Sequence, residues 1–206
     1  MTVIEAVVFD FGQVLVGWDP RRVWADDLTP EQAEALLDEV DFAVVNRRLD
    51  AGARWADIRA DVEAELGEAV RHFDTYLRHY RRSLTGPVEG MSALVEDVRR
   101  AGLRTVGLTN WAAETFHHAA EGAPVIGTIT EVLVSGREGL AKPDPAIFAL
   151  AEKKFGLLPE RTAFLDDSEA NIAAARAAGW HAHVFVDAAD ARSWLHGLGV
   201  ALPAAG

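Results

Sequence analysis

Short β-branched segments alternate with longer helical patterns along most of this 206-residue chain. The predicted strands are Val3–Phe9, Arg104–Thr109, Thr128–Val134, Thr162–Leu165 and His181–Val186. The predicted helices are Val88–Ala101, Trp111–Glu121, Pro145–Phe155, Ser168–Ala178 and Ala188–Leu198. This alternation predicts an α/β fold with a doubly wound, mostly parallel sheet that is covered by helices on both faces.

The alternation is interrupted between about Arg21 and Leu84, where the pattern is helical and no strand is evident. Thr29-Pro30 is typical of a helix start, because threonine caps the first turn and proline suits its first position. We therefore expect an all-helical insertion, the cap, at residues 17–86. The α/β core would comprise residues 1–16 and 87–200, followed by a tail at 201–206. An insertion directly after the first strand would lie over the crevice at the carboxyl edge of the sheet.

The composition limits the classes of partner. Half of the residues are hydrophobic, the formal net charge is −12, and there is no cysteine. The negative charge disfavours nucleic acid or an anionic membrane as the main partner. The absence of cysteine excludes disulfides and thiolate metal sites. No apolar run is long enough to span a bilayer, and no secretory signal is expected. We expect a cytoplasmic monomer or homodimer with a small-molecule partner.

Polar side chains follow the predicted strands at the points where these end. Asp10 ends the first apolar run, and Thr109-Asn110 closes the second predicted strand. Lys142 follows the third, and Asp166-Asp167 ends the fourth. Because the carboxyl ends of parallel strands meet at one edge of a sheet, we expect these groups to converge on one site.

The residue types at this edge indicate phosphoryl transfer. Three carboxylates in a crevice repel one another unless a cation lies between them. Oxygen ligands without Cys or His favour Mg²⁺, which keeps positions for water and a phosphate oxygen. Lys142 adds positive charge, and Thr109 and Asn110 can donate hydrogen bonds to an oxyanion. The Asp10 carboxylate would attack phosphorus, and water would hydrolyse the aspartyl-phosphate that results.

Four segments carry a resemblance to a known family. They are Val7-Val8-Phe9-Asp10-Phe11-Gly12-Gln13-Val14-Leu15, Leu108-Thr109-Asn110, Lys142-Pro143-Asp144-Pro145 and Phe164-Leu165-Asp166-Asp167-Ser168-Glu169-Ala170-Asn171. In this order the set resembles the haloacid dehalogenase (HAD) superfamily of hydrolases, and the predicted cap resembles that family's small helical cap. The resemblance covers about Val3 to Val186 and implies a phosphatase that acts on a small phosphorylated metabolite.

The resemblance also implies roles for individual residues. Asp10 would be the nucleophile, and Lys142 would assist catalysis and bind the transferring phosphoryl group together with Thr109 and Asn110. Mg²⁺ would be held by Asp10, by the backbone carbonyl of Gly12 and by one acid of the 166–167 pair. Asp167 is favoured because it begins an Asp-x-x-x-Asn spacing. Asp166 would then support the site or pair with the lysine.

Position 12 departs from the family pattern. Most phosphatases of this family have a second aspartate there, which acts as general acid and base, whereas this chain has Gly12. A missing acid typically costs 10²–10⁴-fold in rate, and it costs less when the leaving group is acidic. We therefore expect a preference for esters such as sugar 1-phosphates.

Two alternatives remain open, a 2-haloacid dehalogenase and a catalytically degenerate binding protein. Trp18 and Trp111 each follow a motif closely and are candidates to line the crevice.

Overall fold

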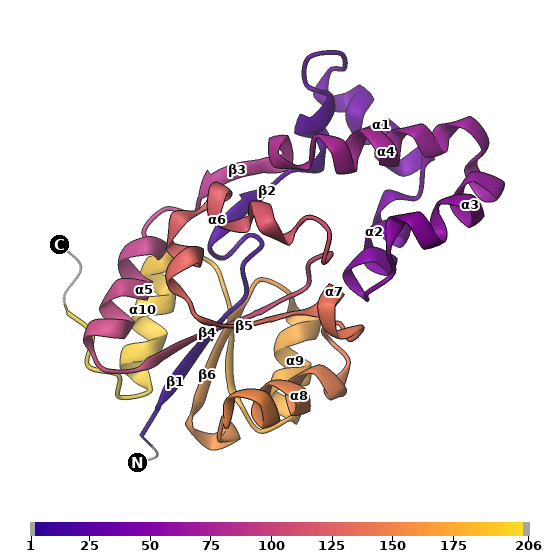
Figure 1. The fold of residues 1–206 in the computed structure, drawn as a ribbon. Coiled ribbons are helices and arrows are strands. Elements are labelled where there is room, and N and C mark those ends of the chain that lie inside the picture. The colour runs from indigo at the N-terminus through magenta and orange to yellow at the C-terminus, as the bar shows by residue number, and fades with distance from the viewer. Residues whose placement is uncertain (1–2, 204–206) are drawn as a thin grey trace.

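A five-stranded parallel sheet forms the centre of the core in the computed structural model, which describes residues 3–203 (Figure 1). The spatial order is β5-β4-β1-β6-β7, and every neighbouring pair is parallel. The strands are β1 (Ala6–Phe9), β4 (Arg104–Thr109), β5 (Glu131–Val134), β6 (Thr162–Asp166) and β7 (His181–Val184). The expected α/β fold is confirmed, although three of the five strands are shorter than predicted from the sequence.

Both faces of the sheet are covered by helices. Val7 and Phe9 of β1 pack with residues of α5 (Met91–Arg100) and α10 (Ala188–Gly197), whereas Val8 packs on the opposite face. That face is covered by α8 (Pro145–Phe155) and α9 (Glu169–Ala177). Because both faces of β1 are buried, the strand must be apolar throughout, and its sequence Ala-Val-Val-Phe meets this requirement. The predicted double winding is confirmed.

Local sequence signals set the ends of several helices. Asp144 accepts a hydrogen bond from the Ala146 amide at the start of α8, and Thr29 forms a reciprocal capping box with Gln32 at the start of α1 (Pro30–Glu39). Gly102 and Gly179 adopt φ angles of 81° and 90° just beyond helices, where residues with a side chain are strained. These helix boundaries therefore follow from single residues.

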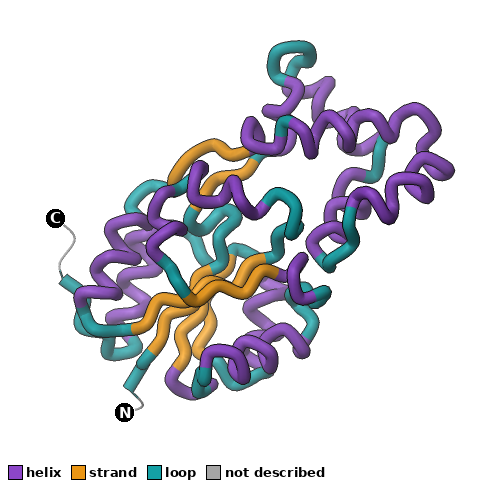
Figure 2. Tube along the Cα trace, viewed as in Figure 1, coloured by secondary structure: helices purple, strands orange, loops and turns teal. Residues whose placement is uncertain are grey.

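The segment between β2 (Val16–Trp18) and β3 (Leu84–Pro87) is helical. Its longer helices are α1, α2 (Phe42–Asp50), α3 (Trp55–Leu66) and α4 (Arg71–Arg78). Helices α2, α3 and α4 share an aromatic cluster in which the Phe42 ring stacks on Phe73 at 5.6 Å and meets Tyr76 edge-on at 4.8 Å. Figure 2 shows these helices as a group apart from the sheet-containing core.

A two-stranded antiparallel ribbon, β2 paired with β3, joins the helical group to the core (Figure 2). This ribbon was not predicted from the sequence. Its strands contain three and four residues, include Gly and Pro, and pair across the whole length of the cap. Strands this short carry no hydrophobic periodicity of their own, so only tertiary pairing reveals them.

The predicted helix Trp111–Glu121 is wrong over its first half. The structure has a 3₁₀ turn at Phe116–His118 followed by the short helix α6 (Ala119–Gly122). The Trp111 amide donates to Ser135 Oγ, which lies in α7 (Ser135–Glu138) beyond the neighbouring strand β5. This tertiary hydrogen bond fixes the chain after β4 in an irregular conformation instead of a helix.

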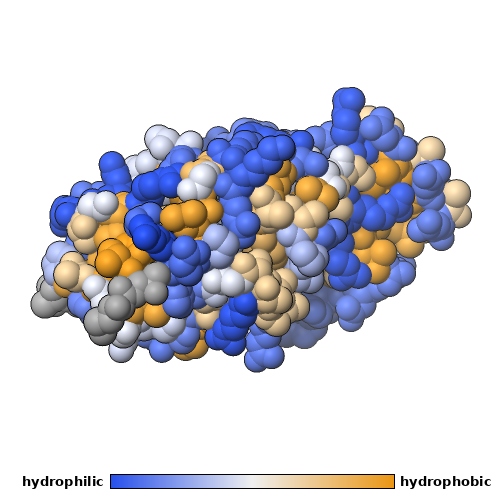
Figure 3. All heavy atoms as spheres, turned by 90° about the horizontal axis from the view of Figure 1, so that it is seen from below, coloured by the Kyte–Doolittle hydropathy of each residue, from blue (hydrophilic) through white to orange (hydrophobic). Residues whose placement is uncertain are grey.

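The surface is mostly polar. Figure 3 shows one face of the molecule on which hydrophilic residues predominate and hydrophobic residues form separate patches. Among residues 3–203, no helix combines the length and the apolar character that crossing a membrane requires.

The strand order reverses at β1, so the carboxyl ends of β1 and β6 flank the crevice where ligands bind in open α/β sheets.

Candidate active site

Asp10 occupies the carboxyl end of the central strand. Its amide donates to the Leu165 carbonyl at 2.9 Å, which continues the pairing of β1 with β6. The Phe11 amide donates to Asp10 Oδ1 at 2.7 Å and fixes the carboxylate. The chain then folds back tightly, with Gln13 at a φ of 58° and its side-chain amide bonded to the Trp18 carbonyl at 3.0 Å. The turn thus directs a buried carboxylate into the crevice.

Lys142 is buried between two acids. Its ammonium group lies 3.0 Å from Asp10 Oδ1 and 2.5 Å from Asp166 Oδ2, and it donates to the Leu108 carbonyl at 2.9 Å. The side chain of Lys142 has no exposed surface. These three contacts use all the protons of the ammonium group. The two carboxylates keep the pKa of Lys142 above its usual value, although burial acts in the opposite direction.

Two asparagines fix this ion pair. Asn110 Nδ2 donates to the Lys142 carbonyl, and Asn110 Oδ1 accepts from the Lys142 amide, each at 2.8 Å. Asn171 Nδ2 donates to Asp166 Oδ1 at 2.9 Å, and the Ser168 amide donates to the same oxygen at 2.8 Å. Asn110 therefore binds the backbone of Lys142 directly, and its expected contact with substrate stays a prediction.

Three carboxylates gather at the sheet edge. Asp10, Asp166 and Asp167 each have an oxygen within 4.8 Å of the others, and the first two are buried. Burial raises the pKa of Asp10 to about 7 against the lowering effect of Lys142. Burial and the neighbouring Asp166 likewise raise the pKa of Asp167. When all are ionised, three negative charges face the single positive charge of Lys142. This excess of negative charge is carried by hard oxygen ligands, so the cluster is suited to bind a divalent cation such as Mg²⁺.

The Thr109 hydroxyl has no acceptor in the described part of the chain. Thr109 ends β4 and has no exposed surface, and Oγ1 has no hydrogen-bond partner among residues 3–203. A buried hydroxyl without a partner costs stability, so one that persists calls for an explanation, and binding of a ligand is one. Its place at the end of β4, beside the strand that carries Asp10, fits a donor to a bound oxyanion.

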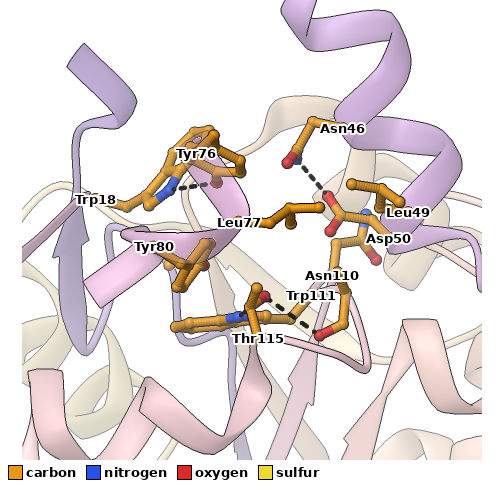
Figure 4. A pocket seen from close by; sticks show the side chains of 12 residues that line it. Trp18, Asn46, Leu49, Asp50, Tyr76, Leu77, Tyr80, Asn110, Trp111 and Thr115 are labelled. Atoms are coloured by element: carbon orange, nitrogen blue, oxygen red, sulfur yellow. Dashed lines mark hydrogen bonds between the residues drawn. The ribbon is translucent and has the colours of Figure 1, made fainter. Parts of the chain in front are cut away.

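A cavity of about 90 Å³ lies between the cap and the core (Figure 4). This volume is large enough for several water molecules or for a small organic group. The lining residues are Gly12, Trp18, Asn46, Leu49, Asp50, Tyr76, Leu77, Tyr80, Asn110, Trp111, Ala112 and Thr115. Both tryptophans proposed from the sequence are among them. The described lining contains no lysine, arginine or histidine.

The cap contacts the core beside this cavity. Ser135 Oγ donates to the Asp50 carbonyl at 2.6 Å, and the Trp55 amide donates to Glu114 Oε2 at 2.8 Å. Gly52, at a φ of 100°, approaches Gly139 so closely that a β-carbon at 52 would lie 2.8 Å from the Gly139 Cα. The cap is therefore closed on the core in this structure.

The structure brings together Asp10, Thr109, Lys142 and the 166–167 pair, and Gly12 lines the adjacent cavity. The cap residues Asn46, Asp50 and Tyr76 also line this cavity, and none of them was predicted from the sequence. They lie within ordinary amphipathic helices, and no motif distinguishes them from surface or core positions.

Comparison with protein families identifies the fold. The family described as haloacid dehalogenase-like hydrolase matches residues 4–179. The chain belongs to this family. It is therefore a HAD-like hydrolase, and the four segments that carried the resemblance all lie within the matched residues.

Known relatives extend the comparison. The chain is 36% identical over 178 residues to phosphoserine phosphatase from Thermus thermophilus. The aligned region covers 82% of this chain and 69% of the relative. It is 29% identical over 189 residues to phosphoglycolate phosphatase from Rhodospirillum rubrum, with 85% and 76% covered. A HAD family enzyme from Bacteroides thetaiotaomicron, solved with magnesium and inorganic phosphate, shares the fold at a TM-score of 0.68 and 21% identity, with 89% and 95% covered.

Proposed function

We propose that this HAD-like hydrolase is a Mg²⁺-dependent phosphatase that forms an aspartyl-phosphate on Asp10. The observation that carries the proposal is the buried lysine between two carboxylates, beside an unsatisfied threonine hydroxyl. Anion-binding donors, a nucleophile and a cation site in one crevice are the parts that phosphoryl transfer requires. The similarity to two phosphatases supports the same class of reaction.

The acid cluster contains candidate ligands for Mg²⁺. Asp10, the Gly12 carbonyl and Asp167 would hold the cation, because Asp166 is already bonded to Lys142 and Asn171. Asp167 is exposed whereas Asp166 is buried, so Asp167 is the more accessible acid of the pair. When bound, the cation supplies charge neutralisation at the phosphoryl oxygens.

The residues of the chain account for the remaining steps. The Asp10 carboxylate, oriented by the Phe11 amide, attacks phosphorus, and the leaving oxygen departs toward the cavity. Thr109 donates a hydrogen bond to a phosphoryl oxygen. Lys142 stabilises the negative charge electrostatically, and it can donate to the phosphoryl group only by exchanging its bond to Asp10. The closed cap limits the access of bulk water during this step.

The leaving group can be narrowed further. Position 12 carries no acid, and an acidic leaving oxygen depends less on proton donation from whichever group acts in its place. The cavity has aromatic walls and the Asn46 amide, and its lining within residues 3–203 contains no basic side chain, so it disfavours a leaving group that carries a second anion. A neutral polyol such as the sugar of a sugar 1-phosphate fits these features. The carboxylate of a haloacid would face the acid cluster, so no feature of the site favours the dehalogenase alternative.

The test compares glucose 1-phosphate with glucose 6-phosphate by kcat/KM in the presence of Mg²⁺, with Asp10→Asn as the inactive control. We expect a higher value for glucose 1-phosphate. Equal or reversed values would exclude the leaving-group argument. Turnover that persists in the Asp10→Asn variant, or no turnover of any phosphate ester by the native chain, would contradict the phosphatase itself.

A further inference from the structure

Position 12 is an open space in the cavity wall. A β-carbon built on Gly12 would have no neighbouring atom within 4 Å, and its φ is not in the left-handed region. Nothing around this glycine therefore excludes an aspartate, yet the chain has none. A proton for the leaving oxygen must come from another group that faces the cavity or from water.

Asp50 is the carboxylic acid among the described residues that line the cavity. It is the last residue of α2 and faces the cavity from the cap, opposite the core residues Asn110 and Trp111 (Figure 4). The other ionisable lining groups are Tyr76 and Tyr80. Burial raises the pKa of both phenols above the usual value, which makes them poor proton donors and acceptors near neutral pH.

The Asp50 carboxyl group is held in place from two sides. Asn46 Nδ2 donates to Asp50 Oδ2 at 2.9 Å, and the Ala112 amide of the core also donates to the carboxyl group. The backbone carbonyl of the same residue accepts from Ser135 Oγ at 2.6 Å. These contacts fix the end of α2 against the strand edge that carries the reacting groups.

The electrostatic surroundings of Asp50 favour proton exchange near neutral pH. Burial raises the pKa of Asp50 to about 7, opposed by the Ala112 amide and by the charge of Lys142. The two charged side chains of the adjacent helix α7 are engaged elsewhere. Arg137 lies over the Phe116 ring, and Glu138 pairs with Lys154. A general acid is most effective when its pKa lies near the working pH.

We propose that Asp50 of the cap is the general acid and base that position 12 of this chain does not provide. This inference rests on the proposed phosphatase function. As the Asp10 oxygen bonds to phosphorus and the ester P–O bond breaks, the carboxylic acid of Asp50 gives its proton to the departing oxygen, which leaves as an alcohol. The Asp50 carboxylate then takes a proton from water as the water oxygen attacks phosphorus. The acyl-phosphate P–O bond breaks, which releases hydrogen phosphate and restores the Asp10 carboxylate.

A purely structural role for Asp50 gives a different outcome. If it only anchors the cap, its replacement lowers the activity on all esters alike. If it transfers protons, the loss depends on the leaving group. Asp50→Asn keeps an oxygen that can accept from the Ala112 amide, so it tests proton transfer with little change in shape.

The experiment measures kcat/KM of the native chain, Asp50→Asn and Asp61→Asn, an exposed acid on cap helix α3, with two probes. Glucose 6-phosphate has a weakly acidic leaving group, and acetyl phosphate has a strongly acidic one. We expect Asp50→Asn to lose about 10²-fold on glucose 6-phosphate but less than about fivefold on acetyl phosphate. We expect Asp61→Asn to match the native chain. The native kcat/KM for glucose 6-phosphate should also fall as the pH rises above about 7, and this decline should vanish in Asp50→Asn.

A second variant keeps the test decisive. Position 12 has space for a side chain, so an aspartate there can replace the missing acid. The double variant Gly12→Asp, Asp50→Asn should therefore have a kcat/KM for glucose 6-phosphate at least about tenfold above that of Asp50→Asn alone. Equal losses on both probes, an unchanged pH profile or no recovery in the double variant would overturn the role of Asp50. These outcomes leave the phosphatase proposal intact as long as the native chain turns over both probes and Asp10→Asn does not.

Discussion

Lys142 Nζ lies 2.5 Å from Asp166 Oδ2, and both side chains are completely buried. A buried ion pair gains little when it forms, because each charge loses its hydration. Removing one member, however, leaves the other charged and unpaired in the interior. The pair beneath the Asp10 carboxylate therefore links the activity of the chain to its stability.

We expect Lys142→Met to lower the free energy of unfolding by about 3–5 kcal/mol and to abolish activity, because Asp166 and Asp10 lose their cation. Urea unfolding followed by circular dichroism measures the first effect. Lys153→Met, at an exposed position of helix α8, is the control and should change stability by less than about 0.5 kcal/mol. Equal stability of the two variants would show that the buried pair has no such role.

Thr109→Val should separate activity from stability. The substitution removes a buried hydroxyl that has no partner among residues 3–203, so we expect unchanged or slightly higher stability. A donor lost from an oxyanion site costs about 10²–10³-fold in kcat. The two measurements are thermal unfolding and phosphate release. A large drop in stability with normal kcat would contradict the predicted contact with substrate.

Metal removal distinguishes the phosphatase from the dehalogenase alternative. EDTA should abolish hydrolysis of phosphate esters and added Mg²⁺ should restore it, because the proposed mechanism places a cation among the three acids. Asp167→Asn should raise the Mg²⁺ concentration for half-maximal activity by at least about tenfold. Glu169→Gln, an exposed acid on the following helix turn, should leave that concentration unchanged. Full activity in EDTA would exclude the proposed metal site.

The raised pKa of Asp50 predicts a pH-dependent difference in stability. The folded chain keeps the Asp50 proton up to about pH 7, whereas the unfolded chain releases it near pH 4. The folded state therefore loses stability through this residue as the pH rises between these values. Asp50→Asn removes that loss. At pH 8 its free energy of unfolding should exceed that of the native chain by about 2 kcal/mol, a value reduced from the full effect of the pKa shift because solvent screens the carboxylate. The difference should shrink toward pH 5, as measured by urea unfolding.

The opposite result would contradict this prediction. If Asp50→Asn lost stability relative to the native chain as the pH rises, the folded state would stabilise the Asp50 carboxylate. Asp61→Asn serves as the control here as well, because this exposed acid lies on the cap surface outside the cavity lining.

Much of the sheet was predictable because its strands are local apolar runs that end in polar residues. Asp10 and Thr109 lie at strand ends in the sequence, and parallel pairing then places them at one edge. The glycines after α5 and α9 and the caps of α1 and α8 were predictable for a similar reason, since each depends on a single residue.

The remaining features depend on contacts between distant segments. The β2–β3 ribbon joins residues on opposite sides of the cap, and Trp111 is diverted from a helix by Ser135. Asp50 faces the cavity only because α2 ends against α7. No local periodicity encodes any of these three arrangements, so a single sequence does not reveal them.

The contact between Gly52 and Gly139 couples the closure of the cap to the position of Asp50. A β-carbon at position 52 would lie 2.8 Å from the Gly139 Cα, so a methyl group there would push the two surfaces apart. Asp50 lies two residues earlier, and its carbonyl accepts from Ser135 Oγ of helix α7, whose C-cap residue is Gly139. The same displacement would therefore admit solvent and draw the proposed acid away from the core, so a single glycine at this seam serves both properties.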